Sequence, residues 1–307
     1  MITTICLNPC FDKTVEIETL QMGEVNRIRK VRQDMGGKGI NVATVAHRLG
    51  LDCECIGCMG EDGSAQLVAM LEREGLRHDF ITVPGSVRTN MKIVADDQKG
   101  VTELNEPGTP LTEENLAAFF ELARQKARGS STVVLTGSLP PECPDSTYHD
   151  LMREMDGTAC ILDTTGQGLM MGAKARPFLM KPNLSELQAT LGLELRTLRS
   201  IRDAALLFIK KGAKHMIVSM GAMGAMYVGD DRTLFAPALR VDARSTVGAG
   251  DAMIGGILKG LEVERDMASA FRYGVAAGAA SVMTEGTQLI RLEDFEMLLK
   301  QVRVQEV

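Results

Sequence analysis

The stretch STVGAGDAM, residues 245–253, places three small residues and one carboxylate directly before an apolar run that is typical of a helix. Gly248 and Gly250 permit backbone conformations that larger residues resist, and with Ala249 they let a ligand approach the main chain closely. The first N–H groups of a helix have no partner within it, so this turn predicts an anion-binding site. Asp251 lies at or near the helix start, where aspartate is also a favoured N-cap.

A second glycine cluster, MGGKGINVA, occupies residues 35–43 and contains Lys38, followed by Asn41 at a predicted helix start. Such a loop suits the approach of hydroxyl groups or a phosphate to the backbone, or it is a tight connection with a solvated lysine. The stretch NPCFD, which follows the first predicted strand, supplies Asn8 and Asp12. These side chains could bond ligand hydroxyls, or they could form a turn.

The stretch VRTNMK places Arg88, Asn90 and Lys92 at alternate positions. If the segment is a strand, all three side chains lie on one face, where two cations and an amide could hold a phosphate or carboxylate. The alternative is a solvated edge strand on which lysine opposes aggregation.

Two further clusters follow predicted strands. In KPNLSEL, Lys181 precedes Asn183 and Glu186, which stand one helical turn apart and could face a metal or phosphate together. The same spacing predicts a capping box. The stretch SMGAMGA, residues 219–225, suits a turn facing a nucleotide or a plain hairpin.

The elements that must position these residues alternate along the chain. Apolar strand-like runs occupy 3–7, 132–137, 159–163, 177–181 and 214–219, and helical patterns occupy 64–74, 113–128, 184–191, 199–211 and 267–283. This alternation predicts one α/β domain over residues 1–307, with a mostly parallel sheet covered on both faces. Ligands bind at the carboxyl ends of such strands, where most of the clusters lie.

Residues 13–33 and 86–104 depart from this pattern, because apolar and polar residues alternate there with period two. This period predicts half-exposed antiparallel strands, which could form a small sheet over a site or an ordinary edge hairpin.

Composition excludes several classes of protein. Among 307 residues, 34 Lys and Arg stand against 40 Asp and Glu, a net charge of −6 that does not favour a nucleic-acid partner. No secretory signal or apolar run of membrane-spanning length is visible, so we expect a cytoplasmic protein without a membrane partner.

The seven cysteines are an odd number and fit reduced thiols. The cluster CECIGC, residues 53–58, is more typical of a buried strand than of a metal site.

Taken in order, nine stretches resemble the phosphofructokinase-B branch of the ribokinase-like sugar kinases: NPCFD, GGKGINVA, VRTNMK, GSLPPE, LDTTG, KPNLSEL, VSMGAMGA, STVGAGDAM and GAASVMTEGT. The resemblance implies a Rossmann-like three-layer αβα fold with a β-sheet lid. The lid would comprise about 12–34 and 86–105, close over the sugar and often serve in homodimer contacts.

The resemblance also implies roles for individual residues. Asp251 would be the catalytic base, and the amides of Gly248, Ala249 and Gly250 would form the anion hole for the phosphoryl group. Mg²⁺ would be held, partly through water, by Asn183 and Glu186, with Lys181 near the ATP phosphates. The residues that would contact the nucleotide are Ser219, Gly221, Gly224, Val275, Gly278 and Ala279. Those that would hold the sugar are Asp12, Gly36, Gly37, Lys38, Asn41 and Ser138.

Substrate choice follows from the positive charge of the lid and the glycine loop. The lid supplies Arg27, Arg88 and Lys92, and the glycine loop adds Lys38. This is more positive charge than a neutral sugar needs, so we expect a phosphorylated hexose. The branch members most similar in these motifs phosphorylate fructose 1-phosphate at O6. Tagatose 6-phosphate kinases and 6-phosphofructokinases are the alternatives, and a non-catalytic nucleotide or sugar-phosphate sensor is a further one.

Three positions depart from the usual pattern of the family. Thr109 replaces a proline, and Glu142 adds a negative charge near the presumed sugar loop, which leaves the choice of sugar open. Ser245 stands where ribokinases often have an aspartate, so the sequence does not support a potassium requirement.

Overall fold

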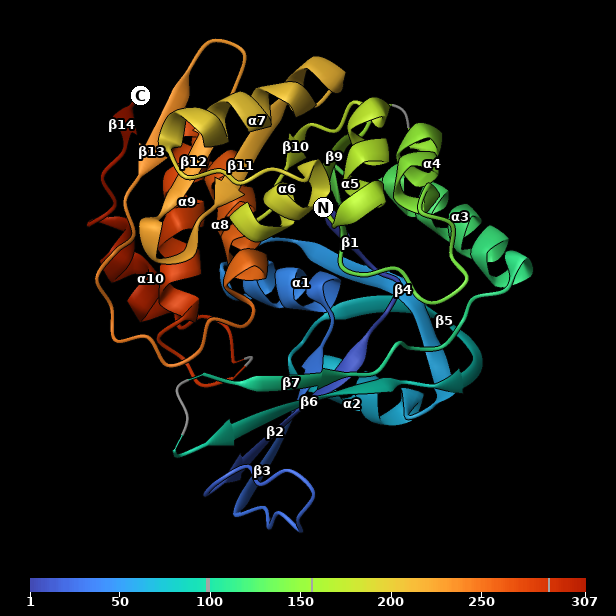
Figure 1. Ribbon diagram of the computed structural model, residues 1–307. Coiled ribbons are helices and arrows are strands. Elements are labelled where there is room, and N and C mark those ends of the chain that lie inside the picture. The colour runs from blue at the N-terminus through green and yellow to red at the C-terminus, as the bar shows by residue number, and fades with distance from the viewer. Residues whose placement is uncertain (98–99, 156, 287) are drawn as a thin grey trace.

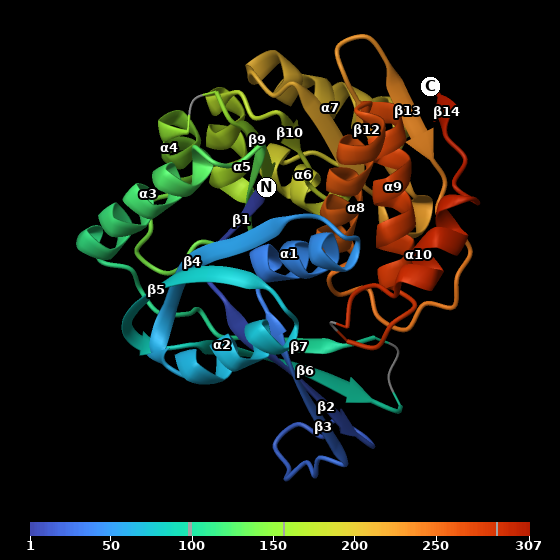
Figure 2. The same ribbon diagram turned by 180° about the vertical axis from the view of Figure 1, so that it is seen from behind.

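The computed structural model describes residues 1–97, 100–155, 157–286 and 288–307, so positions 98–99 of the expected lid and 287 of the last motif lie outside the described residues. A ten-stranded sheet is covered by helices on both faces, and a separate four-stranded sheet lies at one end of this body (Figures 1 and 2). The predicted α/β architecture with a small second sheet is confirmed.

The large sheet is parallel over most of its width. Its strands follow the order β14 (Gln305–Glu306), β13 (Thr233–Ala236), β12 (Ala225–Val228), β11 (His215–Ser219), β10 (Leu179–Met180), β9 (Ala159–Asp163), β8 (Thr132–Thr136), β1 (Ile2–Cys6), β4 (Cys53–Asp62) and β5 (Arg77–Ser86). Every pair from β11 to β5 is parallel, whereas β12, β13 and β14 are added antiparallel. The carboxyl ends of seven strands therefore meet at one edge of the sheet.

Helices divide between the two faces through separate apolar cores. One face carries α3 (Glu113–Ala127), α4 (Thr147–Glu154), α5 (Gly166–Gly172), α6 (Leu184–Leu191) and α7 (Leu198–Lys211). The other carries α1 (Lys38–Arg48), α8 (Ala249–Glu264), α9 (Met267–Ser281) and α10 (Leu292–Leu299). The short α2 (Ser64–Arg73) packs against α1 and β4 in a third core.

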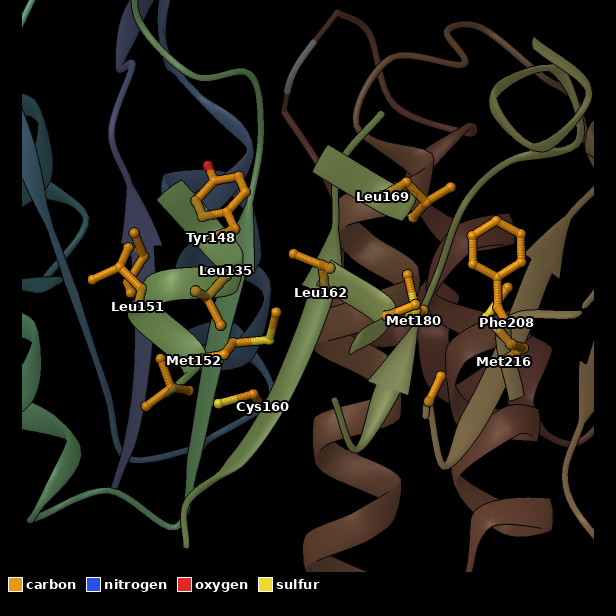
Figure 3. Packing of buried hydrophobic residues seen from close by; sticks show 14 of the residues in the cluster. Leu135, Tyr148, Leu151, Met152, Cys160, Leu162, Leu169, Met180, Phe208 and Met216 are labelled. Atoms are coloured by element: carbon orange, nitrogen blue, oxygen red, sulfur yellow. The ribbon is translucent and has the colours of Figure 1, made fainter. Parts of the chain in front are cut away.

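Figure 3 shows the larger core, in which Leu135, Leu162, Met180 and Met216 come from four neighbouring strands. Tyr148 of α4 is fully buried among them, and its hydroxyl donates to the carbonyl oxygens of residues 136 and 137 at 3.1 and 3.2 Å. Burial of each such side chain contributes about 1.5–3 kcal/mol, so this core fixes the strand ends that reach the site.

The second sheet has the order β3 (Lys30–Gly36), β2 (Cys10–Ile17), β6 (Arg88–Ala95) and β7 (Thr102–Asn105). The period-two alternation correctly predicted strands in both segments. It was wrong for residues 18–29, which form an irregular connection between β2 and β3. Most apolar positions there have no sheet to cover and stay exposed, namely Met22, Val25 and Ile28.

The predicted strand 159–163 and the predicted helix 184–191 agree with β9 and α6 to the residue. The cysteines of the CECIGC cluster are buried in β4, as the core interpretation predicted, and all seven cysteines of the chain are free. Within the described residues, none of the helices has the length and apolarity needed to cross a bilayer.

Candidate active site

A cavity of about 1200 Å³ opens at the carboxyl ends of the parallel strands. Residues at the ends of β1, β8, β9 and β11 line one wall, namely Cys6, Thr136, Asp163 and Ser219. The second sheet lines the opposite wall through β2, β6 and β7. The cavity therefore lies where ligands bind in α/β sheets, and it brings the predicted clusters together.

The turn before α8 has the conformation that its glycines predict. Gly248 is the N-cap of the helix with φ of 79°, a left-handed value that glycine adopts without strain. Asp251 lies in the first turn and makes no capping hydrogen bond, so the capping alternative for this residue is wrong. With the backbone already turned by Gly248, the carboxylate is left free to face the cavity.

Asp251 is 5% exposed, and its Oδ2 accepts a 2.8 Å hydrogen bond from Nδ2 of Asn41 on α1. Burial raises the pKa of this carboxyl to about 6, although Lys38 and the bond from Asn41 favour the charged form. At neutral pH the group is therefore mostly ionised yet close to the pH at which it accepts a proton. Such a carboxylate is suited to act as a general base.

Asp163, at the end of β9, lies between two of the lysines that line the cavity, Lys38 and Lys181. Its Oδ2 is 3.2 Å from Nζ of Lys38, and its Oδ1 is 3.5 Å from Nζ of Lys181. Burial opposes the charged form, but Lys181 and Lys38 together hold the pKa of Asp163 below its usual range. Sequence reasoning missed this residue, although an acid at the last position of the predicted strand 159–163 was the available signal.

The ammonium group of Lys181 lies beside the first turn of α8. A Cβ atom placed on Gly250 would stand only 3.1 Å from its Nζ, so an alanine there would crowd the lysine. The first amides of α8 and a buried ammonium group thus converge on one point of the cavity. Both features attract negative charge, so this point suits the anion that the glycine turn predicts.

Asn183 and Glu186 form the capping box that was the alternative interpretation of their spacing. Glu186 N donates to Oδ1 of Asn183 and Asn183 N donates to Oε2 of Glu186, both at 2.8 Å. The second oxygen of Glu186 remains on the cavity side, 3.6 Å from Nζ of Lys38. Capping and contact with a ligand are therefore compatible here.

A divalent cation would find few protein ligands in this cavity. The described part of the chain contains no group of three His, Cys, Asp or Glu residues able to hold a metal. Asp163 nevertheless offers a buried Oδ1 that makes no hydrogen bond, and Glu186 offers Oε1. This donor set fits Mg²⁺, which binds through one or two carboxylates and takes its other ligands from phosphates and water.

Arg88, Asn90 and Lys92 all line the cavity from β6, as their alternation predicted. Lys92 is already paired with Asp12, with Nζ 2.7 Å from Oδ2 and both side chains buried. Arg88 donates to the carbonyl oxygen of Asn8 at 3.0 Å and so joins the second sheet to the loop after β1. The positive charge that the sequence predicted is thus largely engaged within the protein.

Most of the remaining predicted residues also line the cavity: Gly37, Asn41, Ser138, Ser219, Gly221, Gly224, Val275, Gly278 and Ala279. The turn at 219–225 is both a hairpin between antiparallel β11 and β12 and part of the cavity wall. Arg27 does not belong to this set, because it is exposed in the connection between β2 and β3. Gly36 does not line the cavity, but a Cβ there would stand 2.8 Å from Cγ of Asp12, so its lack of a side chain makes room for that carboxylate.

One wall of the cavity, residues 238–241 and 243, was not predicted. A Cβ on Gly224 would stand 2.0 Å from the carbonyl oxygen of Ala236, so the missing side chain lets this segment pack beside the 219–225 turn. The segment has no regular secondary structure and no glycine or charge pattern, and no sequence signal marked it.

Two of the departures from the family pattern lie away from the cavity. Thr109 donates from its hydroxyl to the carbonyl oxygen of Ser86 at 2.8 Å and thereby holds its loop to the end of β5. Glu142 adopts a positive φ of 69° and is absent from the cavity lining. The charge of Glu142 therefore does not enter the site.

Comparisons with known proteins identify the family of the chain and support its overall fold. The family model described as pfkB family carbohydrate kinase matches residues 5–294. The 1-phosphofructokinase of Bacillus subtilis is 32% identical and covers 99% of both chains, and that of Rhodobacter capsulatus is 35% identical over 99% of this chain and 97% of its own. The crystal structure of phosphofructokinase-2 from Escherichia coli with substrates and products superposes with a TM-score of 0.92 at 28% identity, covering 98% of each chain.

Proposed function

The chain belongs to the pfkB family of carbohydrate kinases, and we propose that it transfers a phosphoryl group from ATP to O6 of fructose 1-phosphate, giving fructose 1,6-bisphosphate and ADP. The observation that carries the proposal is the position of Asp251 in the first turn of α8, within a cavity that also contains Lys181. Relatives named 1-phosphofructokinase match this chain over nearly its full length, which supports the choice of sugar.

In the proposed reaction Asp251 accepts the proton of the O6 hydroxyl. Its pKa of about 6 leaves it ionised at neutral pH, and the amide of Asn41 orients Oδ2. The basicity of this carboxylate is higher than that of an exposed aspartate, which favours proton transfer from a hydroxyl as it attacks phosphorus.

The transferring phosphoryl group would lie at the N-terminus of α8. The amides of Gly248, Ala249 and Gly250 and the ammonium group of Lys181 would neutralise the charge on its oxygens. Lys38, held by Asp163 at 3.2 Å, would stand on the other side of the transferred group. Phosphoryl transfer depends mainly on such positioning and charge neutralisation.

ATP is the phosphoryl donor of this family, and Mg²⁺ would neutralise charge on the ATP phosphates when bound. Glu186 and Asp163 would hold it, partly through water, while Asn183 keeps Glu186 in place through the capping box. Ser219, Gly221 and Gly224 would contact the nucleotide, with Val275, Gly278 and Ala279 along the adenine.

The sugar would lie between the glycine loop and β2, with Asp12, Asn41 and Ser138 bonding its hydroxyls. Its phosphate would lie towards Arg88, Asn90 and Lys92 on β6.

A second copy of the chain would cover the lid, because Met22 and Val25, in the connection between β2 and β3, are 87% and 83% exposed. A neighbour described as a tetrameric form of phosphofructokinase-2 shows that a protein of this fold assembles.

The direct test is turnover with Mg-ATP and each of fructose 1-phosphate, fructose 6-phosphate and tagatose 6-phosphate. We expect fructose 1-phosphate to give the highest kcat/KM. A preference of about tenfold for either of the other sugars would reject this choice and favour a tagatose 6-phosphate kinase or a 6-phosphofructokinase. Binding without turnover of any sugar would favour a sensor.

A further inference from the structure

A second cavity, of about 440 Å³, lies behind the active site. It is open to solvent and is bounded by β3, by α1, by the end of α2 and by the segment before α10. Its lining comprises Gln33, Asp34, Met35, Asn41, Thr44, Arg48, Met70, Arg73, Glu74, Thr284, Gln288, Leu289, Ile290 and Arg291. Apart from Asn41, none of these lining residues has a role proposed above for sugar, nucleotide or metal.

The charges around this second cavity favour an anion. Both acids of the lining already have an arginine partner: Asp34 is 2.8 Å from Nε of Arg32, and Glu74 is 2.6 Å from Nε of Arg48. Arg73 has no hydrogen bond or ion pair within the described part of the chain.

Arg291 is also exposed at this cavity, to 62%. Its guanidinium has one ion-pair partner among the described residues, Oδ2 of Asp294 at 3.9 Å. The distance is long and the guanidinium is mostly exposed, so the pair is weak. Two guanidinium groups, from α2 and from the segment before α10, thus remain without strong partners at one cavity.

The rest of the lining matches a ligand larger than a bare anion. Met35, Met70 and Leu289 provide an apolar surface beside the arginines. A guanidinium group can donate two parallel hydrogen bonds to the oxygens of one phosphate, whereas methionine and leucine side chains pack against the carbon atoms of a ligand. This combination is suited to a small organic phosphate, with its anionic end at the arginines.

The second cavity has a direct connection to the proposed base. Asn41 lines both cavities, and its amide donates to Oδ2 of Asp251 at 2.8 Å. Arg48, on the same helix, donates to the carbonyl oxygens of Gln288 and Ile290 at 2.5 and 3.2 Å and so ties α1 to the opposite wall. A ligand that moved either wall would change the hydrogen bond that orients Asp251.

We propose that this cavity is a regulatory site for a small organic phosphate, bound by Arg73 and Arg291 and coupled to Asp251 through Asn41. Linkage requires that a ligand of this kind have different affinities for the states of the active site. The coupling to Asp251 rests on the proposed function, whereas binding at the cavity does not.

The test compares the wild type, the double variant Arg73→Gln/Arg291→Gln and a matched control, Arg196→Gln/Arg199→Gln. The control removes the same charge from side chains that are 77% and 85% exposed and line neither cavity. The probe is glycerol 3-phosphate, titrated by calorimetry in the presence of Mg-ADP, with glycerol as the uncharged comparison. Urea denaturation checks that all three proteins fold.

We expect the double variant to bind glycerol 3-phosphate at least about tenfold more weakly than the wild type and the control, because both charge-assisted contacts are lost. Equal affinity in the three proteins would overturn the site. In turnover at saturating substrates, the probe should change kcat of the wild type but not of the double variant. If glycerol 3-phosphate binds the wild type without changing its kcat, the coupling is overturned. If the wild type turns over none of the sugars even without the probe, that result counts against the proposed function, and the comparison of affinities still tests the site.

Discussion

Replacement of Asp251 by asparagine is expected to lower activity and raise stability in the same protein. In the unfolded chain the carboxyl titrates near 3.8, whereas burial raises the pKa to about 6 in the folded protein. A difference of about two pH units corresponds to about 3 kcal/mol at most, by which the ionised carboxylate disfavours the folded state. Asparagine has the shape of the neutral acid and can still accept the bond from Asn41.

The sign of the pH dependence follows from this raised pKa. As pH rises from about 4 to about 6, the unfolded chain loses the proton of Asp251 before the folded one does, so the wild type becomes less stable relative to Asp251→Asn. Urea denaturation should give similar stabilities near pH 3, below both pKa values, and an advantage of up to about 3 kcal/mol for the variant at pH 8.

A matched control is Asp266→Asn at the N-cap of α9. Hydrogen bonds from the backbone and side chain of Ser269 and from Ala268 N hold the pKa of Asp266 below its usual range, although burial opposes them. Its replacement should therefore give no gain in stability at pH 8. In the same preparations, Asp251→Asn should lose at least about a hundredfold in kcat.

Two results would refute this reasoning. A variant that is no more stable than the wild type at pH 8 would mean that the ionised carboxylate of Asp251 costs the fold nothing. Near-normal turnover by Asp251→Asn would mean that another group accepts the proton of the sugar hydroxyl.

Further predictions concern pH, binding and assembly. If Asp251 is the base, log(kcat/KM) should fall with unit slope below about pH 6 and stay level above about pH 7; a level profile down to pH 5 would contradict the assignment. Arg88→Ala removes the 3.0 Å bond to the carbonyl of Asn8 and should raise KM for the sugar phosphate about tenfold with little change in KM for ATP; an unchanged KM would remove Arg88 from the site. Val25→Glu places a charge on the exposed lid connection and should lower the mass measured by light scattering; an unchanged mass would exclude a lid dimer.

Elements with strong local signals could be predicted from the sequence. The strand 159–163 is a continuous apolar run between turns, and the helix 184–191 begins at the Asn183 capping box. The strand prediction for residues 18–29 was wrong because alternation of residue types does not by itself provide a neighbouring strand with which to pair.

In the candidate active site, too, features set by local sequence could be predicted, whereas features set by contacts between distant parts of the chain could not. The glycine turn before α8 could be recognised because glycine at 248 is required by its positive φ. The contribution of residues 238–241 depends on how Gly224 packs against Ala236, a contact between distant parts of the chain that leaves no pattern in either segment.

The positive charge of the lid and the glycine loop predicted a phosphorylated sugar, but that argument overlooked the ion pairs that these charges make within the protein. Lys92 was expected to be a free cation, but it is buried against Asp12 at 2.7 Å. If a phosphate alone drew Lys92 away, the buried carboxylate of Asp12 would lose its ion-pair partner and keep only the bonds that Asn90 and Cys10 donate to Oδ1, which is unfavourable. If a neutral sugar alone bonded Asp12, it would have to compete with an ammonium group already in place.

A phosphorylated sugar resolves both problems, because its hydroxyls can replace Lys92 as donors to Asp12 while its phosphate binds Lys92. We therefore expect fructose and inorganic phosphate, each added alone, to bind far more weakly than fructose 1-phosphate. The pair of Asp12 and Lys92 would then select for both parts of the substrate in one molecule, which neither residue could achieve as a free charge.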